Sequence, residues 1–263
     1  MIFYFSGTGN TRWAAELLAK TTDEKLLYIP DEMRAGRHEY TLAEDERIGF
    51  CFPTHGWQPP RVVREFIRSL RINKTTEEPF CYALTTCGDS TGETMSILNK
   101  ELARIGLKAE TMFSIIMPES YVCLPFMYTD SDEREAEKIE NAKHQMAYIA
   151  DIVKDRKRGI EGLEKGATPR LYTYVIGSYF NNRMITDKKF TVDTEACINC
   201  GKCASVCPTG NIAFDEHPTW KHDGSCTCCL ACYHYCPRHA INYGGITRRR
   251  GQYYFGHNTT KDK

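Results

Sequence analysis

Apolar residues in the first half of the chain occur in short runs, and helical patterns separate these runs. The runs span Ile2–Phe5, Leu26–Ile29, Ile48–Phe52, Phe80–Thr85 and Thr111–Met117. Helical periodicity follows the first run in RWAAELLAK and recurs at residues 60–70, 92–106 and 132–158. Strands that alternate with helices along a chain form parallel βαβ units. We therefore predict an α/β fold with a doubly wound parallel sheet of five strands in this half.

A loop rich in glycine and hydroxyl side chains joins the first predicted strand to the first predicted helix. It reads SGTGNT and consists of Ser6, Gly7, Thr8, Gly9, Asn10 and Thr11. Backbone N–H groups and the dipole at a helix N-terminus favour an anion, and the side chains add neutral donors for a phosphate monoester. No Gly-Lys-Ser/Thr follows, so the loop is not the nucleotide P-loop. An ordinary turn between strand and helix is the alternative reading of this loop alone.

Two further loops follow predicted strands and are expected at the same edge of the sheet, because ligands in such sheets bind beyond the carboxyl ends of the strands. Trp57 and His55 offer flat rings that could stack on a flavin, and Gly56 and Gly88 allow close approach of the backbone. The alternatives are a packed surface tryptophan and, for Cys87, a small core residue. The residues that we predict to contact a flavin here are Pro53, Thr54, His55, Gly56, Trp57, Thr86, Cys87, Gly88 and Asp89.

Nine of the 13 cysteines lie between positions 197 and 236, in two copies of one spacing. CINCGKCASVCP and CTCCLACYHYCP both fit C-x2-C-x2-C-x3-C-P, the bacterial ferredoxin run in which the fourth cysteine ligates the other cluster. Zinc sites need separated pairs of ligands, and disulfides are rare in a reducing compartment. We therefore predict two [4Fe-4S] clusters. The first is held by Cys197, Cys200, Cys203 and Cys236, and the second by Cys226, Cys229, Cys232 and Cys207.

The sequence around these motifs adds three expectations. Cys228 lies between two ligands and is left over, so we expect it to be packed or exposed. A short helix is expected to carry the fourth cysteine of each motif, and a second short helix is expected after the proline that follows it. The strands predicted next are Ile212–Phe214 and Ile241–Tyr243.

The whole chain resembles the flavodoxin–ferredoxin fusions of anaerobes, the elongated flavodoxin–ferredoxin or EFR-type proteins. SGTGNT is similar to the flavodoxin phosphate loop, and residues 190–245 resemble a bacterial-type two-[4Fe-4S] ferredoxin. The resemblance implies strand order 2-1-3-4-5, phosphate contacts along residues 6–11, an aromatic ring at Trp57 against the flavin, and FMN as that flavin. Two departures are the lack of a strongly acidic docking face and the segment 118–130. A cover over the flavin that includes Tyr121 is one hypothesis for this segment.

Composition supports a chain of two modules. Residues 1–150 hold 17 Lys+Arg and 23 Asp+Glu, a net charge of −6, whereas residues 151–263 hold 17 and 11, a net charge of +6. The predicted parts are a flavodoxin-like module (1–158), a linker (159–189), a ferredoxin module (190–245) and a loose polar tail (246–263). The aromatic stretch 171–180 is expected to pack between the modules or as a helix buried on one of them.

These features predict an electron-transfer protein rather than a nucleic-acid-binding one. A flavin carries one or two electrons and a [4Fe-4S] cluster carries one. We expect the two clusters and FMN to relay single electrons to a redox partner protein or a small acceptor. The alternatives are an oxidoreductase that reduces a small acceptor at an open flavin face, and a ferredoxin with a flavin-free scaffold. No catalytic acid–base pair, signal peptide or membrane-spanning run is recognised, which indicates a cytoplasmic protein.

Overall fold

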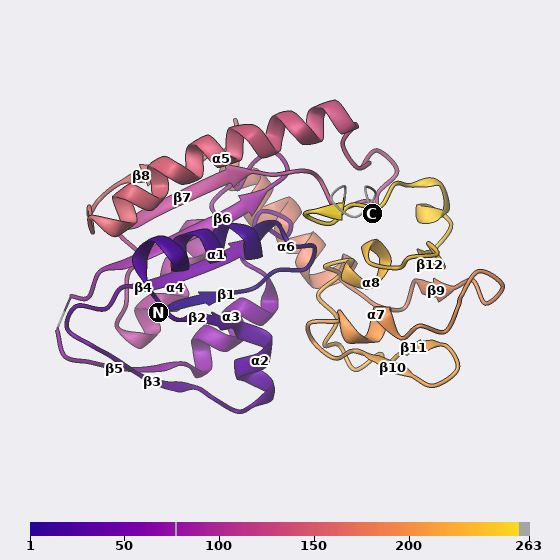
Figure 1. The fold of residues 1–263 in the computed structure, drawn as a ribbon, viewed down its shortest axis with the longest axis horizontal. Helices are drawn as coiled ribbons and strands as arrows, with labels where there is room; N and C mark the ends of the chain where they lie inside the picture. Colours follow the sequence, from indigo (N-terminus) through magenta and orange to yellow (C-terminus); the bar gives the residue numbers. More distant parts are fainter. Residues whose placement is uncertain (77, 258–263) are drawn as a thin grey trace.

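The computed structural model describes residues 1–76 and 78–257, and its first part is a parallel sheet between two layers of helices (Figure 1). The sheet has the order β2-β1-β4-β6-β7-β8. Its strands are β1 (Ile2–Tyr4), β2 (Leu26–Tyr28), β4 (Ile48–Pro53), β6 (Cys81–Cys87), β7 (Thr111–Ile116) and β8 (Glu161–Gly162). The first five follow the predicted order 2-1-3-4-5. The prediction of five strands misses the sixth, β8, in which only two residues of the linker pair with β7.

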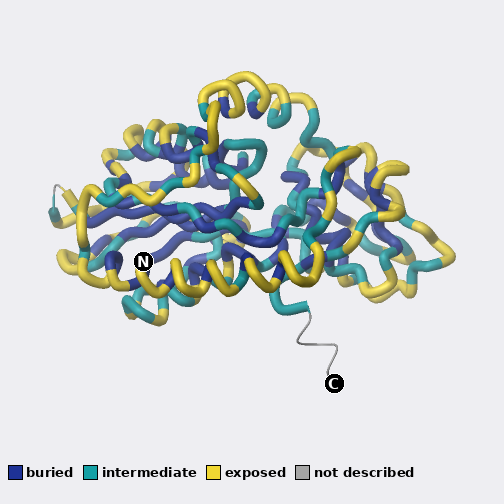
Figure 2. Tube along the Cα trace, turned by 90° about the horizontal axis from the view of Figure 1, so that it is seen from above, coloured by how far each residue is buried: buried dark blue, intermediate teal, exposed yellow. Residues whose placement is uncertain are grey.

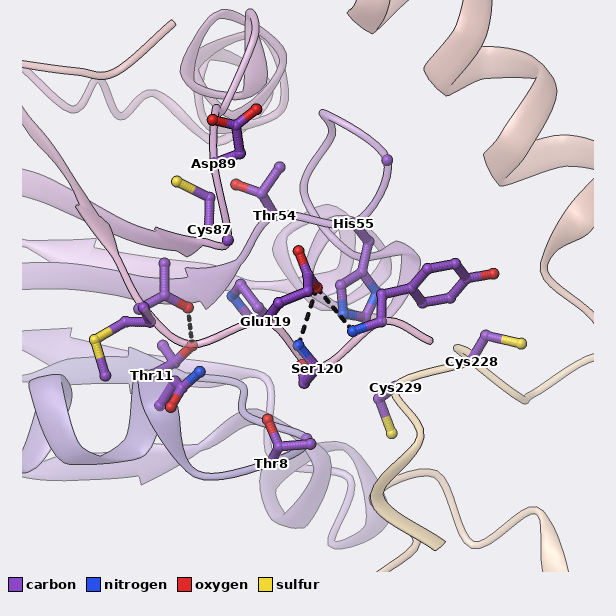
Figure 3. Close-up of a pocket in the computed structure, with 18 of the residues that line it drawn as sticks. Thr8, Thr11, Thr54, His55, Cys87, Asp89, Glu119, Ser120, Cys228 and Cys229 are labelled. Carbon is purple, nitrogen blue, oxygen red and sulfur yellow. Dashed lines mark hydrogen bonds between the residues drawn. The ribbon is translucent and has the colours of Figure 1, made fainter. Parts of the chain in front are cut away.

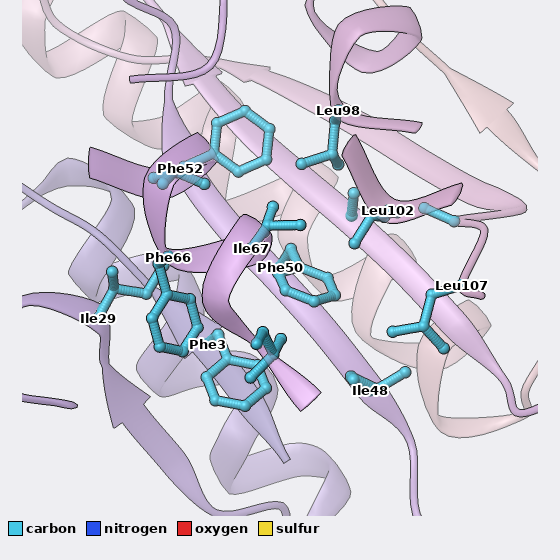
Figure 4. Close-up of a cluster of buried hydrophobic side chains, with 14 of the residues drawn as sticks. Phe3, Ile29, Ile48, Phe50, Phe52, Phe66, Ile67, Leu98, Leu102 and Leu107 are labelled. Atoms are coloured by element: carbon cyan, nitrogen blue, oxygen red, sulfur yellow. The ribbon is translucent and has the colours of Figure 1, made fainter. Parts of the chain in front are cut away.

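Two helices cover one face of the sheet, and three cover the other. Helices α1 (Asn10–Thr22) and α5 (Asp132–Lys154) bury Leu18 and Met146 on the first face. On the second face, α2 (Ile29–Arg34), α3 (Arg61–Ser69) and α4 (Thr94–Leu102) surround a core that includes Phe50 and Phe66 (Figure 4). The sheet strands therefore carry apolar residues toward both faces, as a doubly wound fold requires.

Some local features differ from the expected boundaries. The run Leu26–Ile29 ends as a strand at Tyr28, because Ile29 and Pro30 begin α2, where proline in the first turn is tolerated. The helical pattern at 92–106 becomes α4 followed by the short helix η1 (Ala103–Ile105). The strands β3 (Glu39–Leu42) and β5 (Arg71–Lys74) form a separate parallel pair that the sequence reading missed.

The C-terminal module consists of two antiparallel strand pairs and two short helices. Strand β9 (Phe190–Val192) pairs with β12 (Ile241–Tyr243), and β10 (Ile212–Phe214) pairs with β11 (Pro218–Trp220). Both predicted strands are present. Helices α7 (Lys202–Ser205) and α8 (Ala231–His234) end just before the fourth cysteine of each motif, whereas we expected each helix to carry that cysteine. The second short helix expected after each proline is a turn instead.

The described part of the C-terminal tail is packed, which corrects the expectation of a loose tail. After the short helix η4 (Thr247–Arg249), the tail runs back to the first module. Phe255 N–H donates to the Thr8 carbonyl at 2.8 Å, and the Phe255 ring stacks on Trp13 with 5.2 Å between ring centres. Tyr253 is buried and donates its hydroxyl to Asn10 Oδ1. Residues 258–263 of the predicted tail lie outside the described residues.

The linker contains a continuous helical segment, which we call the linker helix: η2 (Leu171–Ile176), α6 (Gly177–Tyr179) and η3 (Phe180–Met184). Both outer parts have π-helical hydrogen bonding. The prediction that the aromatic stretch 171–180 is buried is wrong for six of its large apolar side chains, which are exposed, whereas Phe180 is half-buried. Across residues 1–76 and 78–257, no helix combines the length and apolar character needed to cross a membrane.

Two buried tyrosines provide a test of the packing. Within the described residues the Tyr82 hydroxyl has no hydrogen-bond partner, whereas the Tyr253 hydroxyl donates to Asn10. We expect Tyr82→Phe to leave the free energy of unfolding unchanged or raise it, because it removes an unsatisfied buried group. Tyr253→Phe should lower it by about 1–3 kcal/mol, because Asn10 loses its donor. Denaturant unfolding of both variants measures the difference, and a larger loss for Tyr82→Phe would contradict this account.

Candidate functional site

A cavity lies at the carboxyl ends of β1, β4, β6 and β7 and faces the C-terminal module (Figure 3). Fourteen of the 15 predicted flavin-contact residues line it, and only Gly9 does not. Gly9 has a φ of 100°, and a Cβ at this position would lie 3.0 Å from Phe255 Cβ. Glycine is therefore required here by backbone conformation and by the packed tail, and the ligand contact of Gly9 stays a prediction.

The first loop presents donors to one end of the cavity. Helix α1 begins at Asn10, so the N–H groups of its first turn have no intrahelical partner. The Ser6 hydroxyl accepts from Gly9 N–H at 3.1 Å, and the Thr11 hydroxyl pairs with the Thr86 hydroxyl at 2.7 Å. The Asn10 amide donates to the Pro118 carbonyl at 3.1 Å, so its side chain holds loops together. Backbone N–H groups and the hydroxyls of Ser6 and Thr8 are the better candidates for binding an anion.

The second loop forms one wall of the cavity through a tight turn. His55 and Gln58 exchange backbone hydrogen bonds of 2.9 and 3.2 Å, and Gly56 and Trp57 at the turn have positive φ angles. Burial lowers the pKa of His55 to about 4, so its imidazole is neutral at physiological pH. The Trp57 indole N–H donates to Ser90 Oγ at 3.1 Å, and its ring lies 4.7 Å from that of Tyr172. Trp57 therefore lines the cavity from a position supported by the linker helix.

The third loop contributes neutral groups and one exposed acid. The Thr54 and Thr85 hydroxyls pair at 2.9 Å where the second and third loops meet. Burial raises the pKa of Cys87 to about 12, so it remains a neutral thiol and contacts the Ile115 carbonyl. Asp89 is exposed at the end of the loop. Cys87 was interpreted from the sequence either as a residue of the flavin loop or as a small core residue. In the structure it is buried and also lines the cavity.

The segment after β7 supplies a wall that the sequence reading left unexplained. Glu119 lies against Gly88 in this wall and accepts from the N–H groups of Ser120 and Tyr121 at 2.9 and 2.8 Å (Figure 3). Burial raises the pKa of Glu119. Tyr121 lines the cavity and packs edge-on against Phe180 of the linker helix, with ring centres 5.3 Å apart. Segment 118–130 is therefore part of the site, and the half-buried carboxylate of Glu119 was missed because it belongs to no local motif.

The C-terminal module closes the cavity from the opposite side. Thr227, Cys228 and Cys229 line it, and Gly7 lies directly against Cys229. A Cβ on Gly7 would be 2.8 Å from Cys229 Cβ and 3.0 Å from its carbonyl oxygen. The left-over Cys228 is buried, and its thiol lies 3.3 Å from the Thr186 carbonyl. The first loop and the second cysteine motif are thus in backbone contact.

His234 adds a second connection between the modules. Its Nδ1 accepts from Tyr253 N–H at 3.0 Å, so Nε2 carries the proton and donates to the Ser120 carbonyl at 2.6 Å. Burial lowers the pKa of His234 to about 4. The structure buries His234 between the C-terminal tail and the segment after β7.

Each predicted group of four cysteines surrounds its own small cavity in the C-terminal module. One cavity is lined by Cys197, Cys200, Cys203 and Cys236, and the other by Cys207, Cys226, Cys229 and Cys232. The fourth cysteine of each motif therefore lies with the first three of the other motif. Within the described residues, no three Cys, His, Asp or Glu side chains converge on a single-ion site. Thr227 and Cys229 line both the second cysteine cavity and the large cavity.

Comparison with known proteins defines the class of the C-terminal module. Residues 190–213 match the family described as 4Fe-4S binding domain. The chain is 37% identical over 71 residues to pyruvate synthase subunit PorD of Methanocaldococcus jannaschii, a match that covers 26% of this chain and 83% of that protein. The chain therefore belongs to the ferredoxin-like family of 4Fe-4S binding proteins that includes PorD, and it carries an iron–sulfur cofactor of this type.

Two solved structures are distant likenesses of part of the chain. A flavoprotein of Bacteroides uniformis is 18% identical, with a TM-score of 0.32, over 53% of this chain and 96% of that one. An azoreductase of Bacillus anthracis is 11% identical, with a TM-score of 0.34, over 57% of this chain and 98% of that one. These values are too low to bear on cofactor or activity.

The contact between Gly7 and Cys229 can be tested directly. We expect Gly7→Ala to lower the free energy of unfolding by about 1–3 kcal/mol, because the methyl group would overlap backbone and Cβ atoms that cannot move freely. Gly245→Ala is the control, since a Cβ there would meet no atom within 4 Å. Denaturant unfolding measures both variants, and equal stability of the two would show that the modules separate easily at this contact.

Glu119 should make stability depend on pH. Its pKa is raised on folding, so the folded chain keeps this proton to a higher pH than the unfolded chain does. The folded chain therefore loses stability as pH rises from the pKa that Glu119 has in the unfolded chain to the higher pKa that it has in the folded chain. Lys138 opposes the shift and Asp130 adds to it. We expect Glu119→Gln to gain stability relative to the wild type as pH rises from about 4.3, the ordinary pKa of a glutamate, to neutral pH. Melting temperatures across this range measure the gain, and a constant difference would contradict it.

Proposed function

We propose that the protein is a flavodoxin–ferredoxin fusion of the EFR type that relays single electrons between two [4Fe-4S] clusters and FMN. One observation carries the proposal: the second cysteine cavity and the large cavity share a wall, which is formed by Thr227 and Cys229. Groups bound on the two sides of this wall would be neighbours. Iron–sulfur binding accounts for electron transfer in general, and the shared wall supports the specific connection to a flavin.

The order of the carriers follows from burial. Cys200 of the first group is exposed and the neighbouring Ile198 is 58% exposed, so this cavity lies close to the protein surface. Cys232 of the second group is buried, and Cys229 lies against Gly7. We propose that a redox partner exchanges electrons at the first cluster and that the second cluster faces the flavin. We propose that the partner is a redox enzyme. The relative PorD is named as a subunit of such an enzyme, pyruvate synthase.

The residues around the large cavity fit FMN. The first turn of α1 and the hydroxyls of Ser6 and Thr8 form a cradle with no acidic side chain, which suits a phosphate group. Gly56 and Gly88 let Phe180 and Glu119 pack directly against the backbone of the wall, and Trp57 lines the same cavity. Bound flavin would supply an acceptor for one or two electrons. Neutral His55 and the Cys87 thiol keep this wall uncharged, while Glu119 places one carboxyl group beside Gly88.

Cofactor content after oxygen-free purification tests the proposal. We expect about eight irons and one flavin per chain in the wild type. Cys200→Ser and Cys232→Ser should each lose about four irons, because each removes a ligand of a different cluster. Cys228→Ala is the matched control and should keep all the iron, since it lies outside both groups of four. Iron and sulfide analysis and the fluorescence of released flavin are the measurements.

The outcomes separate the parts of the proposal. Loss of iron in Cys228→Ala would show that the ligand groups are assigned wrongly. A wild-type protein with full iron and no flavin would leave a ferredoxin with a flavin-free scaffold and would rule out the relay. Reduction of added small acceptors that depends on the flavin would favour the alternative of a substrate-reducing enzyme.

A further inference from the structure

The linker helix places its small and polar residues against the protein. The Thr173 hydroxyl accepts from Glu93 N–H at 2.7 Å, and Gln58 donates to the Thr173 carbonyl at 2.9 Å. Asn181 donates to the His55 carbonyl at 3.1 Å. Gly177 lies so close to the Gly56 carbonyl that a Cβ would be 2.3 Å from its oxygen. The polar side of this helix therefore faces the protein, where it hydrogen-bonds and packs mainly against the second loop of the cavity.

The opposite side of the linker helix is apolar and exposed, which reverses the usual arrangement of a surface helix. Val175 is 61% and Tyr179 is 65% exposed. Figure 2 shows this helix as an exposed coil that stands out from the body where the two modules meet. Contiguous apolar surface of this kind marks an interaction site. The residues that form it, which we call the apolar face, are Leu171, Tyr172, Tyr174, Val175, Ile176 and Tyr179.

Cations surround the apolar face. Arg170 and Arg183 are exposed at its two ends, and neither forms an ion pair with any residue in the described ranges. Lys100 lies over the Tyr174 ring, with its Nζ 5.4 Å from the ring centre. Between residues 170 and 192 the single acid is Asp187, which is buried and bonded to His222 at 2.9 Å. The apolar and tyrosine side chains of this face therefore have an arginine at each end and Lys100 over one ring, and we call these three cations the rim.

We propose that the apolar face of the linker helix binds the surface of a lipid bilayer that carries anionic headgroups. A convex helix with apolar and aromatic side chains and flanking cations has the features of a helix that lies in the bilayer interface. Anionic lipids would complement Arg170 and Arg183, whereas a second copy of the chain would bring further cations to the same rim. This inference goes beyond electron transfer and does not depend on it.

Membrane attachment through this helix would hold the large cavity near the bilayer. Phe180 of the linker helix lines the cavity, and the inner side of the helix contacts Gly56 and Gln58 of the second loop. The helix thus connects a bilayer-bound face directly to the loop that forms one wall of the cavity. The bilayer would be bound without being crossed.

Flotation with lipid vesicles tests the proposal on the full chain purified with its cofactors. We expect the wild type to bind vesicles of phosphatidylcholine with phosphatidylglycerol, and to bind pure phosphatidylcholine more weakly. Leu171→Gln/Val175→Gln/Ile176→Gln should reduce the partition coefficient at least about tenfold. Arg170→Gln/Arg183→Gln should reduce binding to the anionic vesicles about fivefold for each arginine. All five positions are exposed, so folding should be retained, and cofactor absorbance checks this.

A matched control removes exposed apolar side chains elsewhere. Phe126→Gln/Tyr148→Gln changes residues that are 76% and 63% exposed outside the linker helix, and it should bind vesicles as the wild type does. Absence of vesicle binding by the wild type, or equal binding by the triple variant, would overturn the proposal. So would a wild-type dimer in light scattering that becomes a monomer in the triple variant, because a second copy would then cover the apolar face.

Discussion

The close approach of Gly7 to Cys229 is the contact on which the arrangement of the whole site depends. The loop after β1 lies at the start of α1, where free N–H groups can bind an anion, and its other side meets the second cysteine motif. A side chain at position 7 would separate these two parts. Glycine therefore does more here than permit a turn, because its missing Cβ lets one wall belong to two cavities. A group bound in the large cavity would therefore lie close to one bound in the second cysteine cavity.

Hydrogen bonds between uncharged groups hold the two modules together around the contact of Gly7 with Cys229. His234 connects the short helix α8 to Ser120, and Tyr253 connects the tail to Asn10. Both side chains are buried, and neutral partners avoid the cost of burying unpaired charge. The Asn10 side chain bonds to Pro118 and Tyr253, so it holds these segments together, and its phosphate contact stays a prediction. The tail thus contributes to the shape of the cavity, although its sequence looks like a polar end.

The sequence predicts best what depends on local pattern. The apolar runs predict the five main strands of the sheet. The cysteine spacing predicts two groups of four cysteines, and each group surrounds a cavity of its own in the structure. Strand β8 could not be read, because two paired residues show no periodicity. Glu119 was missed because its burial depends on Gly88 and on the segment after β7. Tyr253 and Phe255 become core residues only because the tail returns to α1, which is a long-range contact with no local signature.

The orientation of the linker helix could have been predicted from a spacing in its sequence. LYTYVIGSYF has the composition of a buried helix, yet Thr173, Gly177 and Asn181 recur every four residues within and just beyond it. In an α-helix residues four apart drift slowly around the axis in one direction, and the looser π turns shift them in the other. Mixing the two helix types keeps the three residues on one side, where Gly177 must approach Gly56 closely. Once this side faces the protein, the six residues of the apolar face are directed outward, and Phe180 is the large apolar residue that stays at the cavity. The exposed surface is therefore a consequence of how the helix packs on the loop that forms one wall of the cavity.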